Sequence, residues 1–138
     1  MSAYPNNYIY PAFLYYDADG ISIEFPDLPG CLPCAQDTET ALANAKEALG
    51  LHLFGMEQDG ETIPAPTPVR ELHPDEGGVI AMVEVFMPSV RDRVNKKVVK
   101  KTLTIPAWLN REAEAAHVNF SQVLQEGLKR YLGKPTDA

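Results

Sequence analysis

The stretch YPAFLYYDADGISIEFPDLPGC, residues 10–31, has the pattern of a β-hairpin and decides the fold of the first half of the chain. Aromatic and aliphatic residues fill 8–16, and residues of this kind favour strands. The Asp-Ala-Asp-Gly sequence at 17–20 is typical of a tight turn, because its glycine adopts positive φ without steric cost. Hydrophobic and polar residues alternate over 21–25, which predicts a strand with one buried face. A short extended piece is expected over 32–36.

One long helix is predicted after the hairpin. Asp37 or Thr38 can cap its N-terminus, and Asp59-Gly60 ends it. Apolar residues at spacings of three and four predict one buried stripe, formed by Leu42, Ala45, Leu49, Leu53 and Met56. A further apolar run, 79–87, suits a buried strand. The order ββ(β)αβ predicts an α+β fold in which a helix covers one face of a sheet.

A proline-rich connection separates the helix from that last strand. Prolines at four positions, followed by two glycines, favour extended backbone and exclude a long helix. We therefore expect an irregular connection over 61–78, formed around Pro64, Pro66, Pro68, Pro74, Gly77 and Gly78.

The end of the chain predicts a strand and two helices. Residues 100–105 alternate between polar and apolar types, and Pro106 suits a first helical turn. A helix is expected over 107–117, and Asn119 with Gln122 three residues later predicts the start of a second helix that runs to Leu132. About 35 residues cannot bury a sufficient core alone. We expect two copies to pair their strands into an antiparallel ribbon around four interleaved helices.

The charge of the 138-residue chain is divided unevenly. Residues 1–95 hold four basic and fifteen acidic residues, a balance of −11, whereas residues 96–138 hold eight basic and four acidic residues, a balance of +4. The first part favours a basic partner and the second part favours phosphate. Hydrophobic residues make up 45% of the chain, but we identify no membrane-length apolar run and no secretory signal. With two cysteines, the sequence predicts a reduced, cytoplasmic protein.

Several landmarks of the first region resemble the HicB family of antitoxins. They are Tyr10-Pro11-Ala12, Asp19-Gly20, the run from Phe25 to Cys31, the run from Thr40 to Ala45, and Ile63-Pro64. The resemblance implies a partial ribonuclease-H-like N-terminal domain that binds a small basic, mRNA-cleaving toxin of the HicA type. The tail resembles a ribbon–helix–helix domain, which dimerises and binds operator DNA.

That second resemblance assigns DNA contacts by strand parity. A two-stranded ribbon fits the major groove, so Lys100, Thr102 and Thr104 would contact base edges. A register slip of one residue would present Lys101 and Leu103 instead. The expected phosphate contacts lie around the ribbon and at the start of the second helix; they are Lys96, Lys97, Lys101, Asn119, Phe120 and Ser121.

Acidic residues of the first region allow three interpretations. Asp17, Asp19, Glu24 and Asp27 form a solvated acidic edge, a docking surface for the toxin, or a metal-dependent nuclease centre, which would need converging carboxylates. Cys31 and Cys34 have the spacing of a thiol–disulfide motif, but the helix begins only near Asp37, too late to stabilise a thiolate.

No metal site is predicted, because these cysteines lack a second pair and the histidines stand at no ligand spacing. The histidines are His52, His73 and His117.

We therefore predict an antitoxin without catalytic residues, cofactors or membrane contact. Its toxin-binding domain spans 1–90 and includes the 61–78 connection, a linker covers 91–99, and the ribbon–helix–helix domain spans 100–134. We expect a homodimer that can pair into a tetramer. The alternative is a stand-alone ribbon–helix–helix repressor whose first domain senses a small ligand, and an enzyme is the third possibility.

Overall fold

The computed structural model describes residues 4–134, and the chain divides into two compact units. Unit 1 spans residues 1–98 and unit 2 spans residues 99–138. The first three residues of the predicted toxin-binding domain lie outside the described residues.

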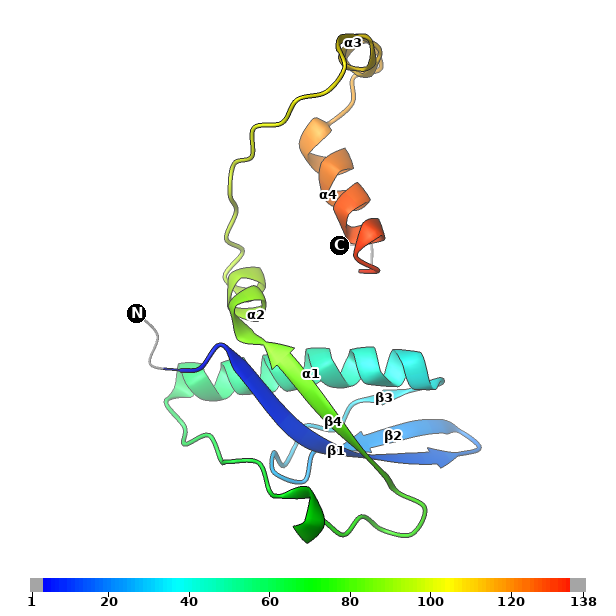
Figure 1. Cartoon of the computed structure of the whole chain (residues 1–138), viewed down its shortest axis with the longest axis vertical. Coiled ribbons are helices and arrows are strands. Elements are labelled where there is room, and N and C mark those ends of the chain that lie inside the picture. Colours follow the sequence, from blue (N-terminus) through cyan, green and yellow to red (C-terminus); the bar gives the residue numbers. More distant parts are fainter. Residues whose placement is uncertain (1–3, 135–138) are drawn as a thin grey trace. The chain divides into compact units, whose positions relative to one another are not determined.

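Unit 1 contains a four-stranded antiparallel sheet in the order β3-β2-β1-β4 (Figure 1). The strands are β1 (Asn7–Asp17), β2 (Gly20–Glu24), β3 (Cys34–Ala35) and β4 (Val79–Phe86). The predicted hairpin is confirmed, since β1 pairs with β2 from Phe13↔Glu24 to Asp17↔Gly20. Gly20 has a φ of +134°, and a Cβ there would lie 2.8 Å from the Ala35 carbonyl oxygen, so the turn requires glycine.

The helix α1 (Thr38–Asp59) packs against the sheet and supplies one wall of the core. Asp37 is its N-cap and accepts a hydrogen bond from Thr40 N at 2.8 Å, while Gly60 ends it with a φ of +70°. The predicted buried stripe is wrong at Leu42, which is 43% exposed, because Ala41 occupies the core position. The helix is rotated so that its fully buried side chains are Ala41, Ala45, Leu49 and Leu53.

Strand β4 lies at the edge of the sheet. The sequence predicted a buried strand here, but β4 is buried on one face only. Val83 and Val85 enter the core beneath α1, whereas Met82 and Phe86 on the other face are each 51% exposed. The helical layer covers only one face of the sheet, so alternate residues of β4 face outward. The α+β class is therefore confirmed.

A short helix that the sequence did not predict follows β4. It is α2 (Met87–Val94), which overlaps the predicted linker and buries Met87 and Val90. A Cβ at Gly50 of α1 would approach a Val90 methyl to 2.9 Å, so this glycine lets the two helices approach closely.

The 61–78 connection is irregular except for one 3₁₀ turn, η1 (Val69–Glu71).

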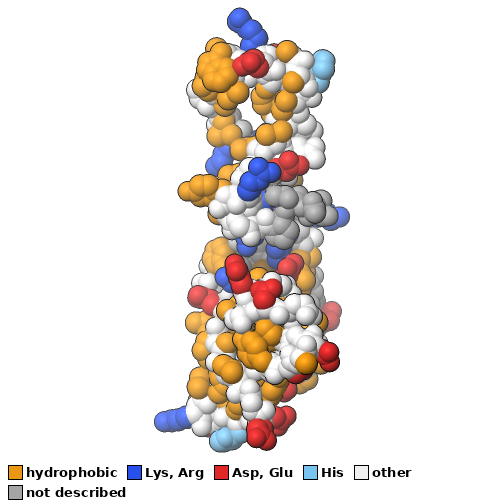
Figure 2. Space-filling model, turned by 90° about the vertical axis from the view of Figure 1, so that its right-hand side faces the viewer, with side chains coloured by type: hydrophobic (Ala, Val, Ile, Leu, Met, Phe, Trp, Pro, Cys, Tyr) orange, Lys and Arg blue, Asp and Glu red, His pale blue; other side chains and the backbone are white. Residues whose placement is uncertain are grey.

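Unit 2 holds the two predicted helices, α3 (Ala107–Ala115) and α4 (Phe120–Tyr131). Asn119 caps α4 and accepts a hydrogen bond from Gln122 N at 3.0 Å, as predicted. The predicted strand over 100–105 is absent, because no other strand pairs with this segment in the single chain. Neither helix buries a single residue, and Figure 2 shows hydrophobic side chains open at the surface of this unit.

Candidate functional site

The four predicted acidic residues lie at two ends of strand β2. Asp17 ends β1 and Asp19 lies in the β1–β2 turn, where Asp17 Oδ1 accepts a hydrogen bond from Asp19 N at 2.8 Å. Glu24 and Asp27 lie at the other end, and both are half-buried. Five residues of strand separate the two pairs by roughly 16 Å, so they do not form one cluster.

Asp27 joins the hairpin to the proline-rich connection. Its Oδ2 accepts a hydrogen bond from Thr67 N at 3.0 Å, and its Oδ1 accepts one from the Thr67 hydroxyl. Tyr10, which lies in the core, donates its hydroxyl hydrogen to the Pro64 carbonyl oxygen. These bonds hold 64–67 against the rest of unit 1, although this segment has no regular secondary structure.

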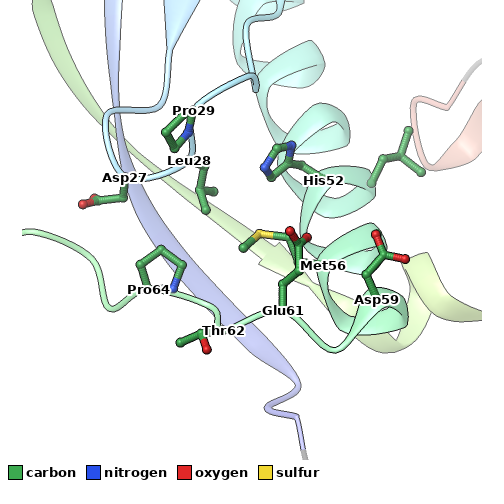
Figure 3. Close-up of a pocket in the computed structure, with 11 residues that line it drawn as sticks. Asp27, Leu28, Pro29, His52, Met56, Asp59, Glu61, Thr62 and Pro64 are labelled. Carbon is green, nitrogen blue, oxygen red and sulfur yellow. The ribbon is translucent and has the colours of Figure 1, made fainter.

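Between these anchored segments and α1 lies an open groove of about 600 Å³ (Figure 3). Asp27, Leu28 and Pro29 form one side, and α1 forms the other with residues at helical spacing. The α1 residues are Leu51, His52, Gly55, Met56 and Asp59, and the segment after the helix adds Glu61, Thr62 and Pro64. The sequence did not predict this groove, because its walls come from segments more than 20 residues apart. The spacing of 52, 55, 56 and 59 along one helix face was the available signal.

A second cluster missed by the sequence joins β1, α1 and α2. Arg91 forms a two-point ion pair with Glu57, at 3.0 Å from Nε to Oε1 and 2.8 Å from Nη2 to Oε2. Tyr8 donates its hydroxyl hydrogen to Glu57 Oε2 at 3.0 Å. Burial raises the pKa of Tyr8, and the hydrogen bond to Glu57 raises it further. This cluster fixes α2 on the rest of unit 1.

The two cysteines have different surroundings. Cys31 is buried, and burial raises the pKa of its thiol to about 11, while Cys34 is exposed in β3. A thiol with a raised pKa is a poor nucleophile at neutral pH, which disfavours thiol–disulfide chemistry at Cys31. Among residues 4–134, no group of three or more His, Cys, Asp or Glu side chains is arranged to hold a metal ion.

The residues predicted to contact DNA are all exposed. Lys100, Thr102 and Thr104 lie in the irregular segment before α3, and Lys101 lies between them. Lys96 and Lys97 follow α2, where Lys97 Nζ lies 3.7 Å from Asp92 Oδ1.

The start of α4 keeps its predicted phosphate-binding groups at the surface. Phe120 and Ser121 occupy its first turn, where backbone N–H groups lack partners within the helix. Asn119 uses its side-chain oxygen to cap this turn.

Residues 10–127 match the family described as HicB_like antitoxin of bacterial toxin-antitoxin system. This chain belongs to the HicB-like antitoxin family. The family expected from the landmarks in 10–64 is thereby confirmed. Among the described residues of this HicB-like antitoxin, no helix is long and apolar enough to cross a membrane.

Two solved structures and one relative resemble this HicB-like antitoxin. A Haemophilus phage HP1 protein, described as an uncharacterized 14.9 kDa protein in the rep-hol intergenic region, is 30% identical over 104 residues, covering 73% of this chain and 75% of that protein. A chain of a toxin–antitoxin complex from Streptococcus pneumoniae is 26% identical with a TM-score of 0.55, covering 91% of this chain and 99% of that chain. The antitoxin HicB of Burkholderia pseudomallei is 21% identical with a TM-score of 0.53, covering 88% and 96%. The last likeness concerns the fold alone.

Proposed function

We propose that this antitoxin neutralises a small basic, mRNA-cleaving toxin of the HicA type and represses its own operon as a DNA-binding dimer. The observation that carries the proposal is the family match over residues 10–127. The similar chain from Streptococcus pneumoniae, which belongs to a toxin–antitoxin complex, supports it over 91% of the sequence.

Unit 1 binds the toxin in this proposal. The balance of −11 over residues 1–95 attracts a basic protein and speeds its association. The predicted contacts at Asp17, Asp19, Glu24 and Asp27 would then form two separate contact regions rather than one. Unit 1 acts by binding, without catalysis of its own.

Unit 2 forms the dimer and contacts the operator. Its exposed apolar side chains provide the surface that a second copy would cover, in a ribbon–helix–helix arrangement. The strands over 100–105 then pair with each other and present Lys100, Thr102 and Thr104 to base edges. Lysines at 96, 97 and 101 and the start of α4 contact phosphates.

Two measurements test the two halves of the proposal. Equimolar antitoxin should abolish RNA cleavage by the toxin, and a toxin that stays fully active would contradict the first half. For DNA, Thr102→Ala and Thr104→Ala should each reduce sequence discrimination by about 1–3 kcal/mol. Lys96→Ala is the matched control, since it should weaken binding to all sequences and lower the salt slope by about 1. An equal loss from all three variants on specific and random DNA would contradict the base contacts.

The groove in unit 1 supports a second candidate function. Its volume of about 600 Å³ lies within the range of about 300–1,000 Å³ that small-molecule sites occupy. In this alternative the chain is a repressor whose first unit senses a small ligand. The absence of a complex with the toxin at micromolar concentration would favour it.

A further inference from the structure

We propose that the groove between residues 27–29, α1 and residues 61–64 receives a lysine or arginine side chain of the toxin. The inference rests on the proposed antitoxin function and deepens it, because it names the contact that places the toxin on unit 1. Three properties of the groove support it: the apolar side chains in each wall, the uncompensated negative charge and the fixed shape.

Apolar side chains form part of each wall and suit a hydrocarbon chain. Leu28 is buried, and Figure 3 shows it between Pro29 and Pro64 in the lining. Met56 and Leu51 supply the α1 wall, and Gly55 keeps it open, since a Cβ there would meet no atom within 4 Å. Long basic side chains pack their methylene stems on such surfaces while the charged end reaches polar groups.

The charged groups around the groove are acidic. Asp27, Asp59 and Glu61 line it, and among the described lining residues none is a lysine or arginine. Figure 3 shows Asp59 and Glu61 on the same side as His52 and Met56, across from Asp27 and Leu28. In the described part of the chain, neither Asp59 nor Glu61 has an ion-pair partner. A cation entering the groove therefore meets carboxylates that no other cation neutralises.

The groove is fixed before any partner binds. Asp27 is held by Thr67, and Pro64 is held by the Tyr10 hydroxyl. Glu61 N donates a hydrogen bond to the Met56 carbonyl oxygen at 3.0 Å, across the left-handed Gly60. A preformed groove loses little conformational freedom on binding, which favours affinity.

A protein side chain fits these properties better than a small apolar ligand. Small-molecule sites enclose most of their ligand and carry few polar groups. Here two of the three carboxylates belong to exposed residues, in a region with a balance of −11. Arginine anchors that enter pockets also dominate the energetics of many protein interfaces.

Charge reversal in the groove tests the inference with the full-length chain and the purified toxin. Asp59→Lys/Glu61→Lys should raise the Kd for the toxin at least 10-fold more than the control Asp75→Lys/Glu76→Lys. The control makes the same change of charge at two exposed residues before β4, outside the groove. Calorimetry at one fixed salt concentration measures both, and circular dichroism confirms that each variant is folded.

Filling the groove tests it without changing charge. Gly55→Phe places a ring in the space above α1, and Ala43→Phe places the same ring on an exposed position of the same helix. Only Gly55→Phe should weaken toxin binding, again by at least 10-fold.

The outcomes separate the inference from the function on which it rests. If the unchanged chain binds the toxin and both groove variants lose affinity relative to their controls, the inference is supported. If it binds the toxin and the groove variants match their controls, the inference is overturned while the antitoxin function stands. If the unchanged chain binds no toxin, the antitoxin function fails and the inference fails with it.

Discussion

Unit 1 and unit 2 treat their hydrophobic residues in opposite ways. In unit 1, side chains from three strands and two helices meet in one core, and those of Leu49, Leu53 and Met87 are fully buried. In unit 2, α3 and α4 carry no buried residue. At the end of α4, Tyr131 is 90% exposed, and Leu132, which follows it, is 66% exposed. Unit 1 has the buried core of a self-sufficient domain. Unit 2 forms two helices, but they lack the buried apolar contacts that stabilise helices in a folded domain. We infer that unit 2 folds stably only with a second copy.

The largest expected effect comes from placing a charge in the dimer core that we propose for unit 2. Leu124→Glu would bury an unpaired carboxylate, which costs about 3–5 kcal/mol. The chain should become monomeric in analytical ultracentrifugation and lose operator binding. Thermal unfolding of unit 1 should not change.

Gln125→Glu is the matched control for this variant, because it introduces the same charge at the neighbouring exposed position. If the Leu124→Glu chain remains dimeric, α4 is not part of the dimer interface.

Truncating the core of unit 1 should give the complementary result. Leu49 is 0% exposed at the centre of α1, so Leu49→Ala should lower the free energy of unfolding of unit 1 by about 3 kcal/mol. Dimerisation through unit 2 should persist. Urea unfolding followed by circular dichroism measures the loss.

Leu42→Ala on the same helix is the control, with an expected loss of about 0.5 kcal/mol because Leu42 is 43% exposed. Equal losses at the two positions would mean that α1 is rotated from the position described above.

The next effect concerns the ion pair that fixes α2 on unit 1. Glu57→Gln leaves the Arg91 guanidinium without its carboxylate in a mostly buried position, at a cost of about 2 kcal/mol. Chemical denaturation of the variant beside the unchanged chain measures this cost. A loss below about 0.5 kcal/mol would show that the pair contributes as little as a surface ion pair.

Tyr8 gives the same cluster a dependence on pH. Its pKa is raised above the ordinary value of 10.0, so the unfolded chain releases this proton first as the pH rises. The stability that Tyr8 contributes is complete below pH 10 and is lost as the pH rises above it. Tyr8→Phe should flatten this decline in stability measured between neutral and alkaline pH. If the decline in stability is unchanged in Tyr8→Phe, other titratable groups cause it.

The smallest effect is expected in unit 2, at the end of α3. His117 has a φ of +56°, in the left-handed region that favours glycine, and its N–H bonds back to the Glu114 carbonyl oxygen. His117→Gly should stabilise the dimer by about 1 kcal/mol. Thermal unfolding at fixed protein concentration measures the gain, and a loss of stability would show that the imidazole makes a contact in the dimer.

Local signals in the sequence predicted most of the secondary structure. The turn at Gly20 and the caps at Asp37 and Asn119 each act through their own neighbours, so their residue types suffice to identify them. Features set by tertiary packing were not predictable in this way. The rotation of α1 that exposes Leu42 depends on the sheet beneath it, and α2 is held by Arg91, whose partner lies 34 residues earlier.

The candidate sites also divide into features with a local sequence signal and features that depend on tertiary packing. The proposed DNA contacts rest on alternation within six residues, yet these residues form no strand in the single chain. The groove unites Asp27 with residues 51–64, and no local pattern links those positions. Asp27 itself was predicted from its charge, but its bonds to Thr67 give it a structural role as well.

Hydrogen–deuterium exchange of the full-length chain at decreasing protein concentration tests the central claim most directly. We predict that amide protection in α3 and α4 falls together with the dimer fraction, while protection in β1 and α1 stays constant. Protected α3 and α4 amides in a chain of monomeric mass would contradict the claim, because unit 2 would then be stable without a second copy.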